Sequence, residues 1–467
     1  MKDEKLIEVR PSKRQIEIQS LGFYAFFHFT INTFTGKEWG DGQESPSLFN
    51  PEEMDADQWV RAIKAAGMKG AILTCKHHDG FCLWPSKYTD HSVKASPYKN
   101  GQGDIVREVS DACKRQGIKF GVYLSPWDRN QGTYGQGKAY NDYFVNQLTE
   151  LLTQYGEVFC VWFDGACGEG KNGKKQDYDW ERYYKTIRKY QPDACISVTG
   201  PDVRWCGNEA GDTRESEWSV VPAAMSVAEK IAEASQQEDN TAFREKTISS
   251  MEQDLGSRAR LKNEEKLIWY PAEVDVSIRP GWFYHEEEDT QVRSLENLVD
   301  IYEKSVGGNA TLLLNIPPMP NGKLNEADVA RLEELGTFLQ KKYEKNLGED
   351  ARIYVEEDQE SILADELKED DFRICYKGKN PQIKVTVMWD VPVDVSAIVL
   401  KENISFSQRV EKYKVFVWGE KGPDLVYEGT TVGFCKIISI KRRKTNAVIV
   451  EIDDSRVAPV LSYVGVY

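Results

Sequence analysis

The sequence predicts a (β/α)8-like barrel over residues 1–347, followed by a C-terminal antiparallel β-sandwich over residues 348–467. Up to about residue 345, apolar strand-like runs alternate with helix-like stretches. After a polar stretch at 341–352, the remaining runs alternate apolar and polar residues with a period of two. A length of 467 residues also suits one large and one smaller domain better than a single compact domain.

Eight strand candidates support the barrel. They are almost continuously apolar, as strands of a buried parallel sheet are, and lie at 22–29, 70–75, 119–125, 157–163, 195–200, 217–221, 267–274 and 310–316. Helical patterns that end in glycine separate several of them, at 55–67, 104–117, 140–156 and 292–307. A doubly wound open sheet is the alternative, but no glycine-rich phosphate-binding fingerprint follows the first strand.

Short, turn-bounded runs of alternating polarity indicate the C-terminal sandwich. They lie at 382–391, 396–404, 412–419, 446–453 and 461–467. We expect this domain to pack against the barrel or to contribute to the rim of a pocket, with sugar binding as the alternative role.

Composition and charge exclude several classes of partner. The formal net charge of −15 argues against a nucleic-acid backbone or an anionic membrane surface. No apolar run reaches the roughly 18 residues of a membrane span, so no membrane insertion is expected. The nine cysteines form no repeated CxxC pair, and we expect most of them to be free and buried, with a metal pair at Cys75 and Cys82 as the minor alternative. No signal peptide is visible, and we expect a periplasmic or secreted protein, with the cytoplasm as the alternative.

Polar side chains gather where the predicted barrel strands end. In such barrels the catalytic groups sit at the C-terminal ends of the strands. Four of the five histidines fall there, although the whole chain has so few. The residues at this predicted rim are His28, Lys76, His77, His78, Asp79, Tyr123, Trp127, Asp128, Asp164, Glu209, Trp282 and His285.

Each of these residues also has a structural interpretation. His28 lies in an aromatic strand and could be a hydrogen-bonded core histidine. On a regular strand, His77 and His78 would point to opposite faces, whereas a turn at the strand end could aim both inward. Asp164 follows a buried strand, where an unpaired charge is costly, and its structural role would be a helix N-cap. Glu209 lies in a polar loop, where glutamates are usually solvated.

Two chemistries fit this set of residues. A pair of carboxylates can hydrolyse a glycosidic bond, one as nucleophile and the other as acid and base, while imidazoles and indoles bind the sugar. A metal-dependent hydrolase would instead use His28, His77, His78 and Asp164 as ligands. Adjacent histidines suit hydroxyl recognition better than a metal site, whose histidines usually share one face. A sugar-binding protein without activity is the third alternative.

Several segments resemble the α-L-fucosidases of glycoside hydrolase family 29. The resemblance covers the barrel from about residue 20 to 345, and the combination of KHHDGF and WFDGA is highly specific. The segment ENISFSQRVEKYKVFVW at 402–418 also looks like the sandwich of this family. The matching barrel segments are FHFTINTFTGKEWGDG (27–42), the run FNPEEM…PSKYT (49–89), GIKFGVYLSPWD (117–128), VWFDGA (161–166) and GGNATLLLNIPPMPNGKL (307–324).

The resemblance implies a retaining mechanism without a cofactor or a metal ion. It places the nucleophile at Asp164 of WFDGA. In the family branch selective for α-1,3 and α-1,4 linkages the acid/base lies in a loop like WCGNEAG, which implies Glu209. Glu215 and Glu217 are the rivals, because RESEWSVVP is also similar to this branch. The acid would need a raised pKa and the nucleophile a normal or low one.

The resemblance also implies a pocket for terminal α-L-fucose on an oligosaccharide or glycoconjugate. Histidines can read the axial 4-hydroxyl through both ring nitrogens, and an apolar wall would face the C6 methyl group. A broad-specificity enzyme that acts on aryl fucosides and α-1,2 linkages is the alternative. The implied substrate-binding residues are His28, Glu38, Trp39, His77, His78, Tyr123 and Trp282.

Overall fold

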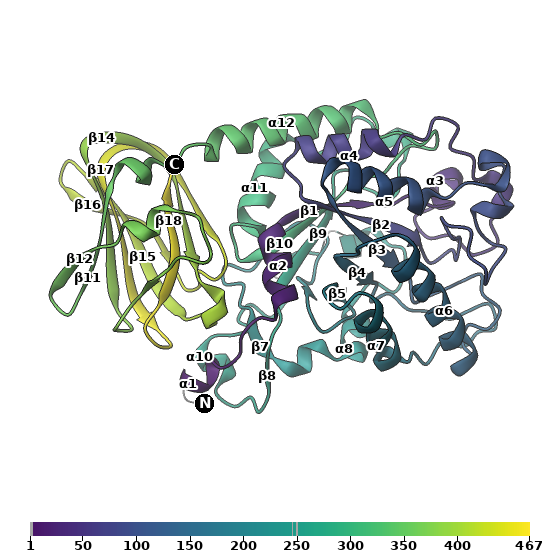
Figure 1. Ribbon diagram of the computed structural model, residues 1–467, viewed down its shortest axis with the longest axis horizontal. Coiled ribbons are helices and arrows are strands. Elements are labelled where there is room, and N and C mark those ends of the chain that lie inside the picture. The colour runs from purple at the N-terminus through teal and green to yellow at the C-terminus, as the bar shows by residue number, and fades with distance from the viewer. Residues whose placement is uncertain (1–2, 245, 249–250) are drawn as a thin grey trace.

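The computed structural model describes residues 3–244, 246–248 and 251–467. A barrel sheet and a C-terminal domain of antiparallel strands lie side by side (Figure 1). The barrel sheet has the strand order β5-β4-β3-β2-β1-β10-β9-β6, and all of its pairs are parallel. Its strands are β1 (Phe23–Phe27), β2 (Gly70–Lys76), β3 (Lys119–Leu124), β4 (Cys160–Phe163), β5 (Cys195–Val198), β6 (Arg204–Trp205), β9 (Ala272–Ser277) and β10 (Ala310–Asn315).

The two edges of this sheet nearly meet. A parallel bridge joins Ser197 of β5 to Val203, the residue before β6. The Val198 N–H donates to the Val203 carbonyl at 3.0 Å. The sheet is therefore a nearly closed eight-stranded barrel, as predicted, and the alternative of a doubly wound open sheet is wrong.

Helices surround the barrel where the sequence predicts them. The predicted helical ranges correspond to α4, α5, α6 and α11. Side chains cap the starts of α4, α5 and α11, as at α5, where Asp104 accepts from the Arg107 N–H. Gly117 follows α5 with a left-handed backbone. The helices are α1 (Asp3–Leu6), α2 (Lys13–Leu21), α3 (Asn32–Thr35), α4 (Ala56–Ala65), α5 (Ile105–Gln116), α6 (Lys138–Gln154), α7 (Trp180–Tyr190), α8 (Ala228–Ala234), α9 (Thr241–Arg244), α10 (Arg258–Leu261), α11 (Leu295–Ser305) and α12 (Glu326–Tyr343).

The sixth barrel strand lies elsewhere than predicted. The run at 217–221 does not enter the barrel sheet, because β7 (Val220–Pro222) pairs antiparallel with β8 (Leu267–Trp269) in a separate sheet. The sixth position is taken by β6, which pairs with β9. With two residues, β6 is too short for a hydrophobic pattern to reveal it. The predicted strand at 267–274 also divides into β8 and β9, on either side of Pro271.

The C-terminal domain is built around two long strands. β14 pairs with β17 along most of its length, while its first half pairs with β11 and its second half with β18. Irregular register between Met388 and Val393 separates these halves. The domain is rich in antiparallel strands, in agreement with the predicted sandwich. The strands are β11 (Arg352–Glu357), β12 (Glu360–Leu363), β13 (Tyr376–Lys377), β14 (Ile383–Glu402), β15 (Val410–Gly419), β16 (Gly422–Gly429), β17 (Lys436–Ser455) and β18 (Val460–Val466).

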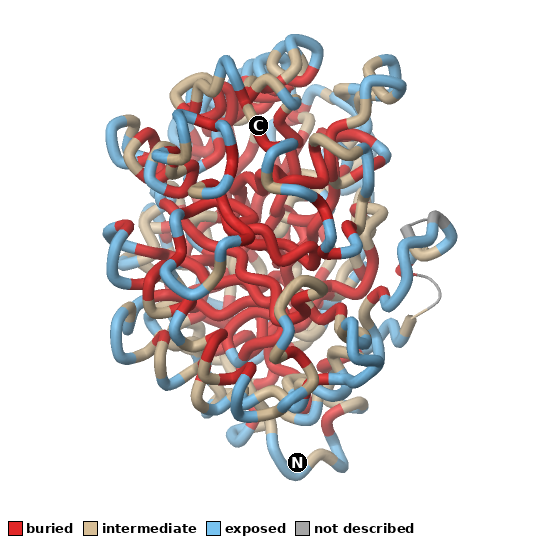
Figure 2. Tube along the Cα trace, turned by 90° about the vertical axis from the view of Figure 1, so that its right-hand side faces the viewer, coloured by how far each residue is buried: buried red, intermediate tan, exposed pale blue. Residues whose placement is uncertain are grey.

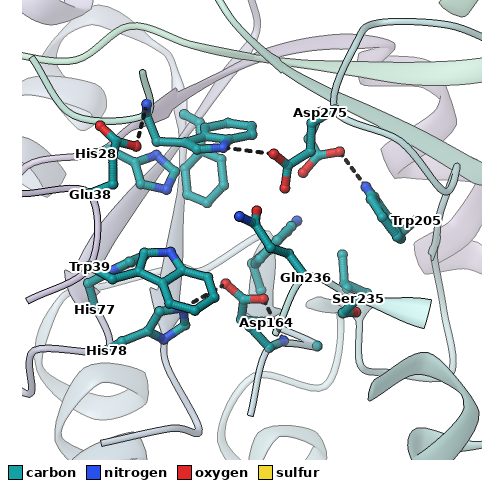
Figure 3. Close-up of a pocket in the computed structure, with 17 residues that line it drawn as sticks. His28, Glu38, Trp39, His77, His78, Asp164, Trp205, Ser235, Gln236 and Asp275 are labelled. Carbon is teal, nitrogen blue, oxygen red and sulfur yellow. Dashed lines mark hydrogen bonds and ion pairs between the residues drawn. The ribbon is translucent and has the colours of Figure 1, made fainter. Parts of the chain in front are cut away.

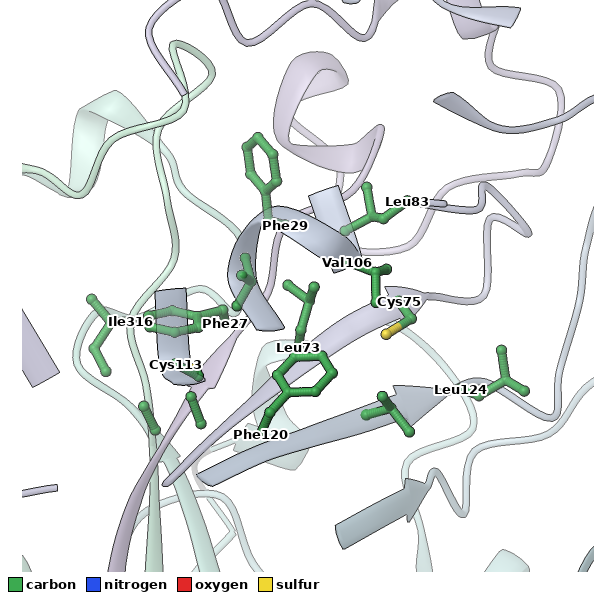
Figure 4. Packing of buried hydrophobic residues seen from close by; sticks show 14 of the residues in the cluster. Phe27, Phe29, Leu73, Cys75, Leu83, Val106, Cys113, Phe120, Leu124 and Ile316 are labelled. Carbon is green, nitrogen blue, oxygen red and sulfur yellow. The ribbon is translucent and has the colours of Figure 1, made fainter. Parts of the chain in front are cut away.

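Alternation along the barrel strands divides the core into two parts. Phe27 of β1 packs outward against Trp59 of α4, in the large cluster between strands and helices (Figure 4). Tyr24 and Phe26 of the same strand point into the barrel and join an inner cluster with Trp162. Buried residues fill the interior of the molecule, and the exposed residues lie mainly at its periphery (Figure 2). The inner cluster forms the floor on which the candidate site is built.

Neither disulfides nor membrane spans are found in the described chain. All nine cysteines are free, and all but Cys167 and Cys375 are buried, as expected. Within residues 3–244, 246–248 and 251–467, no helix combines the length and apolar character needed to cross a bilayer.

Candidate active site

A cavity of about 600 Å³ opens at the C-terminal end of the barrel strands (Figure 3). Tyr123 is the one residue of the predicted site that does not line it; its ring lies in the inner cluster and its hydroxyl contacts Asp164. The predicted residues that line the cavity are His28, Glu38, Trp39, His77, His78, Asp164, Glu209 and Trp282.

Asp164 comes directly after β4, and neutral donors hold its carboxylate. The Tyr123 hydroxyl donates to Oδ2 at 2.8 Å, and the Ala166 N–H donates to Oδ1 at 2.9 Å. Burial raises the pKa of Asp164, and these hydrogen bonds oppose that rise. The net direction differs from the normal or low pKa expected for a nucleophile, because burial of the carboxylate outweighs its hydrogen bonds. Its side chain is 22% exposed, toward the cavity.

Three histidines that line the cavity are buried and neutral. Burial lowers the pKa of His28 to about 4 and that of His78 to about 3, and it also lowers the pKa of His77. His28 follows β1 and contacts Asn315 Oδ1 through Nδ1 at 2.8 Å, while His78 Nδ1 contacts Ser125 Oγ at 2.7 Å. These hydrogen bonds fix the ring orientations.

The adjacent pair His77 and His78 faces the same cavity. β2 ends at Lys76, and the chain then turns, with the Gly80 N–H donating to the His77 carbonyl. The two ring centroids lie 4.1 Å apart. Within the described residues, His77 Nδ1 and His78 Nε2 are buried without a hydrogen-bond partner, and His78 Nε2 lies 3.6 Å from Asp164 Oδ2. Such atoms are costly to leave unpaired, so they indicate a ligand that supplies hydroxyl or similar groups.

The same corner also offers a possible metal-ligand set. Donor atoms of His77, His78 and Asp164 lie within 4.8 Å of one another. His28, which the metal alternative requires as a fourth ligand, is not part of this set among the described residues. Its Nδ1 is engaged by Asn315 instead.

Some polar residues of the predicted rim support the fold and do not line the cavity, namely Lys76, Asp79 and Asp128. Lys76 is fully buried and donates to Asp128 Oδ2 at 2.9 Å and to Gln147 Oε1 at 3.0 Å. Asp79 accepts from the Thr30 hydroxyl and the Phe81 N–H. These contacts brace the loop that carries the two histidines.

Glu38 anchors the segment that carries Trp282. Its carboxylate accepts from the Trp282 N–H at 2.9 Å and the Phe283 N–H at 3.2 Å, and it contacts His285 Nε2 at 2.6 Å. The hydrogen bond to Glu38 raises the pKa of His285. The Trp282 ring lies against His28, with centroids 5.0 Å apart. The indole therefore forms a fixed aromatic wall.

Glu209 is the rim glutamate that reaches the cavity. It lies in the loop after β6, and Trp282 Nε1 donates to its Oε2 at 3.1 Å. Glu217 is 1% exposed and bound to Arg204 and Arg214, whose charges outweigh burial and lower its pKa. Glu215 is exposed, and neither Glu215 nor Glu217 is among the residues that line the cavity.

The sequence interpretation missed six polar or aromatic residues that line the cavity. Asp275 is 5% exposed on β9, where the predicted strand stopped one residue short of it. The alternation of Glu273, Asp275 and Ser277 along an otherwise apolar strand was an available signal for inward-facing polar groups. The missed residues are Phe26, Trp162, Trp205, Ser235, Gln236 and Asp275.

A cavity at the C-terminal rim of a barrel, with several carboxylates, neutral imidazoles and aromatic walls, is typical of a glycoside hydrolase. Comparisons with known proteins agree. The sequence model of the α-L-fucosidase family matches residues 17–344. Alpha-L-fucosidase 1 of Arabidopsis thaliana is 37% identical over 470 residues, which cover 98% of this chain and 87% of that protein.

Solved structures extend the similarity to the whole fold. A chain from Bacteroides ovatus has a TM-score of 0.86 at 44% identity and covers 100% of this chain and 75% of that chain. A GH29 fucosidase of Ruminococcus gnavus, solved in complex with fucose, has a TM-score of 0.84 at 30% identity, with coverage of 98% and 95%. The chain belongs to the α-L-fucosidase family, glycoside hydrolase family 29.

The environment of Glu217 predicts a loss of stability on substitution. We expect Glu217→Gln to lower the free energy of unfolding by about 3 kcal/mol, because it leaves two buried guanidinium groups without their counter-charge. Denaturant unfolding measures this loss. Glu215→Gln is the matched control, with an expected change within about 0.5 kcal/mol. A normal stability together with lost turnover in Glu217→Gln would instead make Glu217 a catalytic group.

Proposed function

We propose that the protein is a retaining, exo-acting α-L-fucosidase in which Asp164 is the nucleophile and Glu209 the general acid/base. The observation that carries the proposal is that these two carboxylates line one cavity, from the ends of β4 and β6. Retaining glycosidases need such a pair about 5–5.5 Å apart on either side of the scissile bond. The family match favours this chemistry over a metal-dependent hydrolase.

The proposed reaction has two steps. An oxygen of Asp164 attacks C1 of the fucosyl group, the C1–O bond to the leaving group breaks, and Glu209 protonates the departing oxygen. In the second step Glu209 takes a proton from water, the resulting hydroxide attacks C1, and Asp164 is released. The hydrogen bonds from Tyr123 and Ala166 orient the nucleophile in both steps.

Fucose recognition follows from the neutral imidazoles and the aromatic walls. His77 Nδ1 and His78 Nε2, which make no hydrogen bond to the described residues, would bind hydroxyl groups of one sugar, as donor or acceptor according to tautomer. His28, Glu38 and Trp39 add further contacts to the ring. Aromatic rings at Trp282 and Phe26 would pack against the C6 methyl group.

We further propose a preference for α-1,3 and α-1,4 linked fucose on Lewis-type oligosaccharides or glycoconjugates. The loop WCGNEAG and the segment RESEWSVVP support this preference through their resemblance to the selective branch of the family. The broad-specificity alternative would hydrolyse aryl fucosides and α-1,2 linkages equally well.

Two variants test the catalytic roles with an aryl fucoside that carries a good leaving group. We expect Asp164→Ala to abolish turnover, because no group remains to attack C1. We expect Glu209→Ala to lose about 10²–10⁴-fold in kcat/KM on oligosaccharides but far less on the aryl fucoside, which needs no protonation. Product analysis by NMR in azide gives the control: Glu209→Ala should form a fucosyl azide of retained configuration. Wild-type activity of Glu209→Ala on Lewis oligosaccharides would contradict its role.

The proposed linkage preference predicts selective cleavage. Lewis a and Lewis x trisaccharides should be hydrolysed well, and 2′-fucosyllactose poorly, because its fucose is α-1,2 linked at the end of a linear chain whereas theirs is an α-1,4 or α-1,3 branch. Release of fucose measured in parallel for the three sugars tests this. Equal rates would favour the broad-specificity alternative, and loss of all activity on chelation would favour a metal-dependent enzyme.

A further inference from the structure

Two acidic side chains lie on the same wall of the cavity. Asp275 points inward from β9, and Glu209 lies in the loop after the neighbouring strand β6. The parallel pairing of β6 and β9, with Trp205 opposite Glu273, brings this loop beside Asp275. Figure 3 shows Asp275 on the side of the cavity opposite the corner formed by His77, His78 and Asp164.

A tryptophan N–H holds each of these carboxylates. Trp205 Nε1 donates to Asp275 Oδ1 at 2.6 Å, and Trp282 Nε1 donates to Glu209 Oε2 at 3.1 Å. An indole N–H orients a carboxylate but adds no positive charge. The carboxyl group of Asp275 is therefore fixed in place without a cation in its described hydrogen bonds.

The groups that face Asp275 add negative charge. The acidic groups are Glu209 from the β6 loop and Glu273 from β9 itself, whereas the Cys206 thiol after β6 stays neutral, because burial raises its pKa well above the usual range. On the other side, β10 places Leu313 beside Asp275 in the sheet. Burial raises the pKa of Asp275, and the charges of Glu209 and Glu273 raise it further. Two carboxylates so placed resist being ionised together.

We infer that Asp275 is a positioning residue that forms, with Glu209, a carboxyl–carboxylate pair holding one shared proton next to the scissile bond. The inference rests on the proposed role of Glu209 as acid/base. The last proton leaves such a pair at a higher pH than it would leave either group alone, because the second charge forms beside the first. In the first step the pair gives this proton to the departing oxygen, and in the second step it recovers one proton from water.

The pH dependence of kcat/KM on a Lewis trisaccharide tests the pair. This parameter covers the steps up to departure of the leaving group, and its alkaline limb reports loss of the catalytic proton. In Asp275→Asn the amide oxygen can still accept from Trp205, but the negative charge is gone. We expect the alkaline limb to move to lower pH by about 1 unit. At a pH above the limb, the kcat/KM of this variant should therefore be about tenfold lower than that of the wild type.

A second variant shifts the same limb in the opposite direction. Trp205→Phe removes the hydrogen bond that lowers the pKa of Asp275, so we expect its alkaline limb to move to higher pH. An aryl fucoside with a good leaving group should show neither shift, because its departure needs no proton. Unshifted limbs on the trisaccharide, in Trp205→Phe and in any folded Asp275→Asn, would overturn the pair.

Glu209→Gln, measured beside these variants, separates failure of the pair from failure of the proposed function. If Glu209→Gln retains wild-type rates on the trisaccharide, Glu209 is not the acid, and both the proposed function and the pair fail. If Glu209→Gln loses those rates while Asp275→Asn and Trp205→Phe titrate as the wild type, only the pair fails.

Discussion

Desolvation of titratable groups at one end of the barrel is the constraint on which the site depends. Three imidazoles and several carboxyl groups are removed from water on a floor of aromatic rings. Burial disfavours every charged form, so the histidines are neutral and are free to act as both donors and acceptors. A neutral, preorganised pocket of this kind suits an uncharged ligand rich in hydroxyl groups better than an ionic one.

Two groups of buried carboxylates differ in their partners. Glu217 and Asp328 bind guanidinium groups and tie segments of the fold together. Asp164, Glu273 and Asp275 accept instead from phenol or indole donors. A cation would stabilise the ionised form strongly and make it a poor nucleophile or acid, whereas a neutral donor orients the group and leaves its proton exchange accessible. Among the described residues, no arginine therefore binds these three carboxylates at the end of the barrel where the reaction is proposed to occur.

The sequence predicted which residues lie at the barrel rim wherever the ends of the strands could be recognised. Asp164 and His77 follow long apolar runs, and the rule that parallel barrel strands end at one rim brought them together. The same rule also selected Lys76, which the structure places in a buried ion pair outside the cavity, because sequence position does not fix the direction of a side chain. β6 escaped detection because two residues carry no periodicity, and Asp275 because the predicted strand ended just before it.

Identification of the residue that carries the fucosyl group tests the central claim most directly. A slow fluorinated fucosyl fluoride should trap the covalent intermediate, and mass spectrometry of the digested protein would locate the added mass. The account predicts one fucosyl adduct, on the peptide that contains Asp164, together with an initial product of retained anomeric configuration. An adduct on another residue, or an inverted initial product without any adduct, would contradict it.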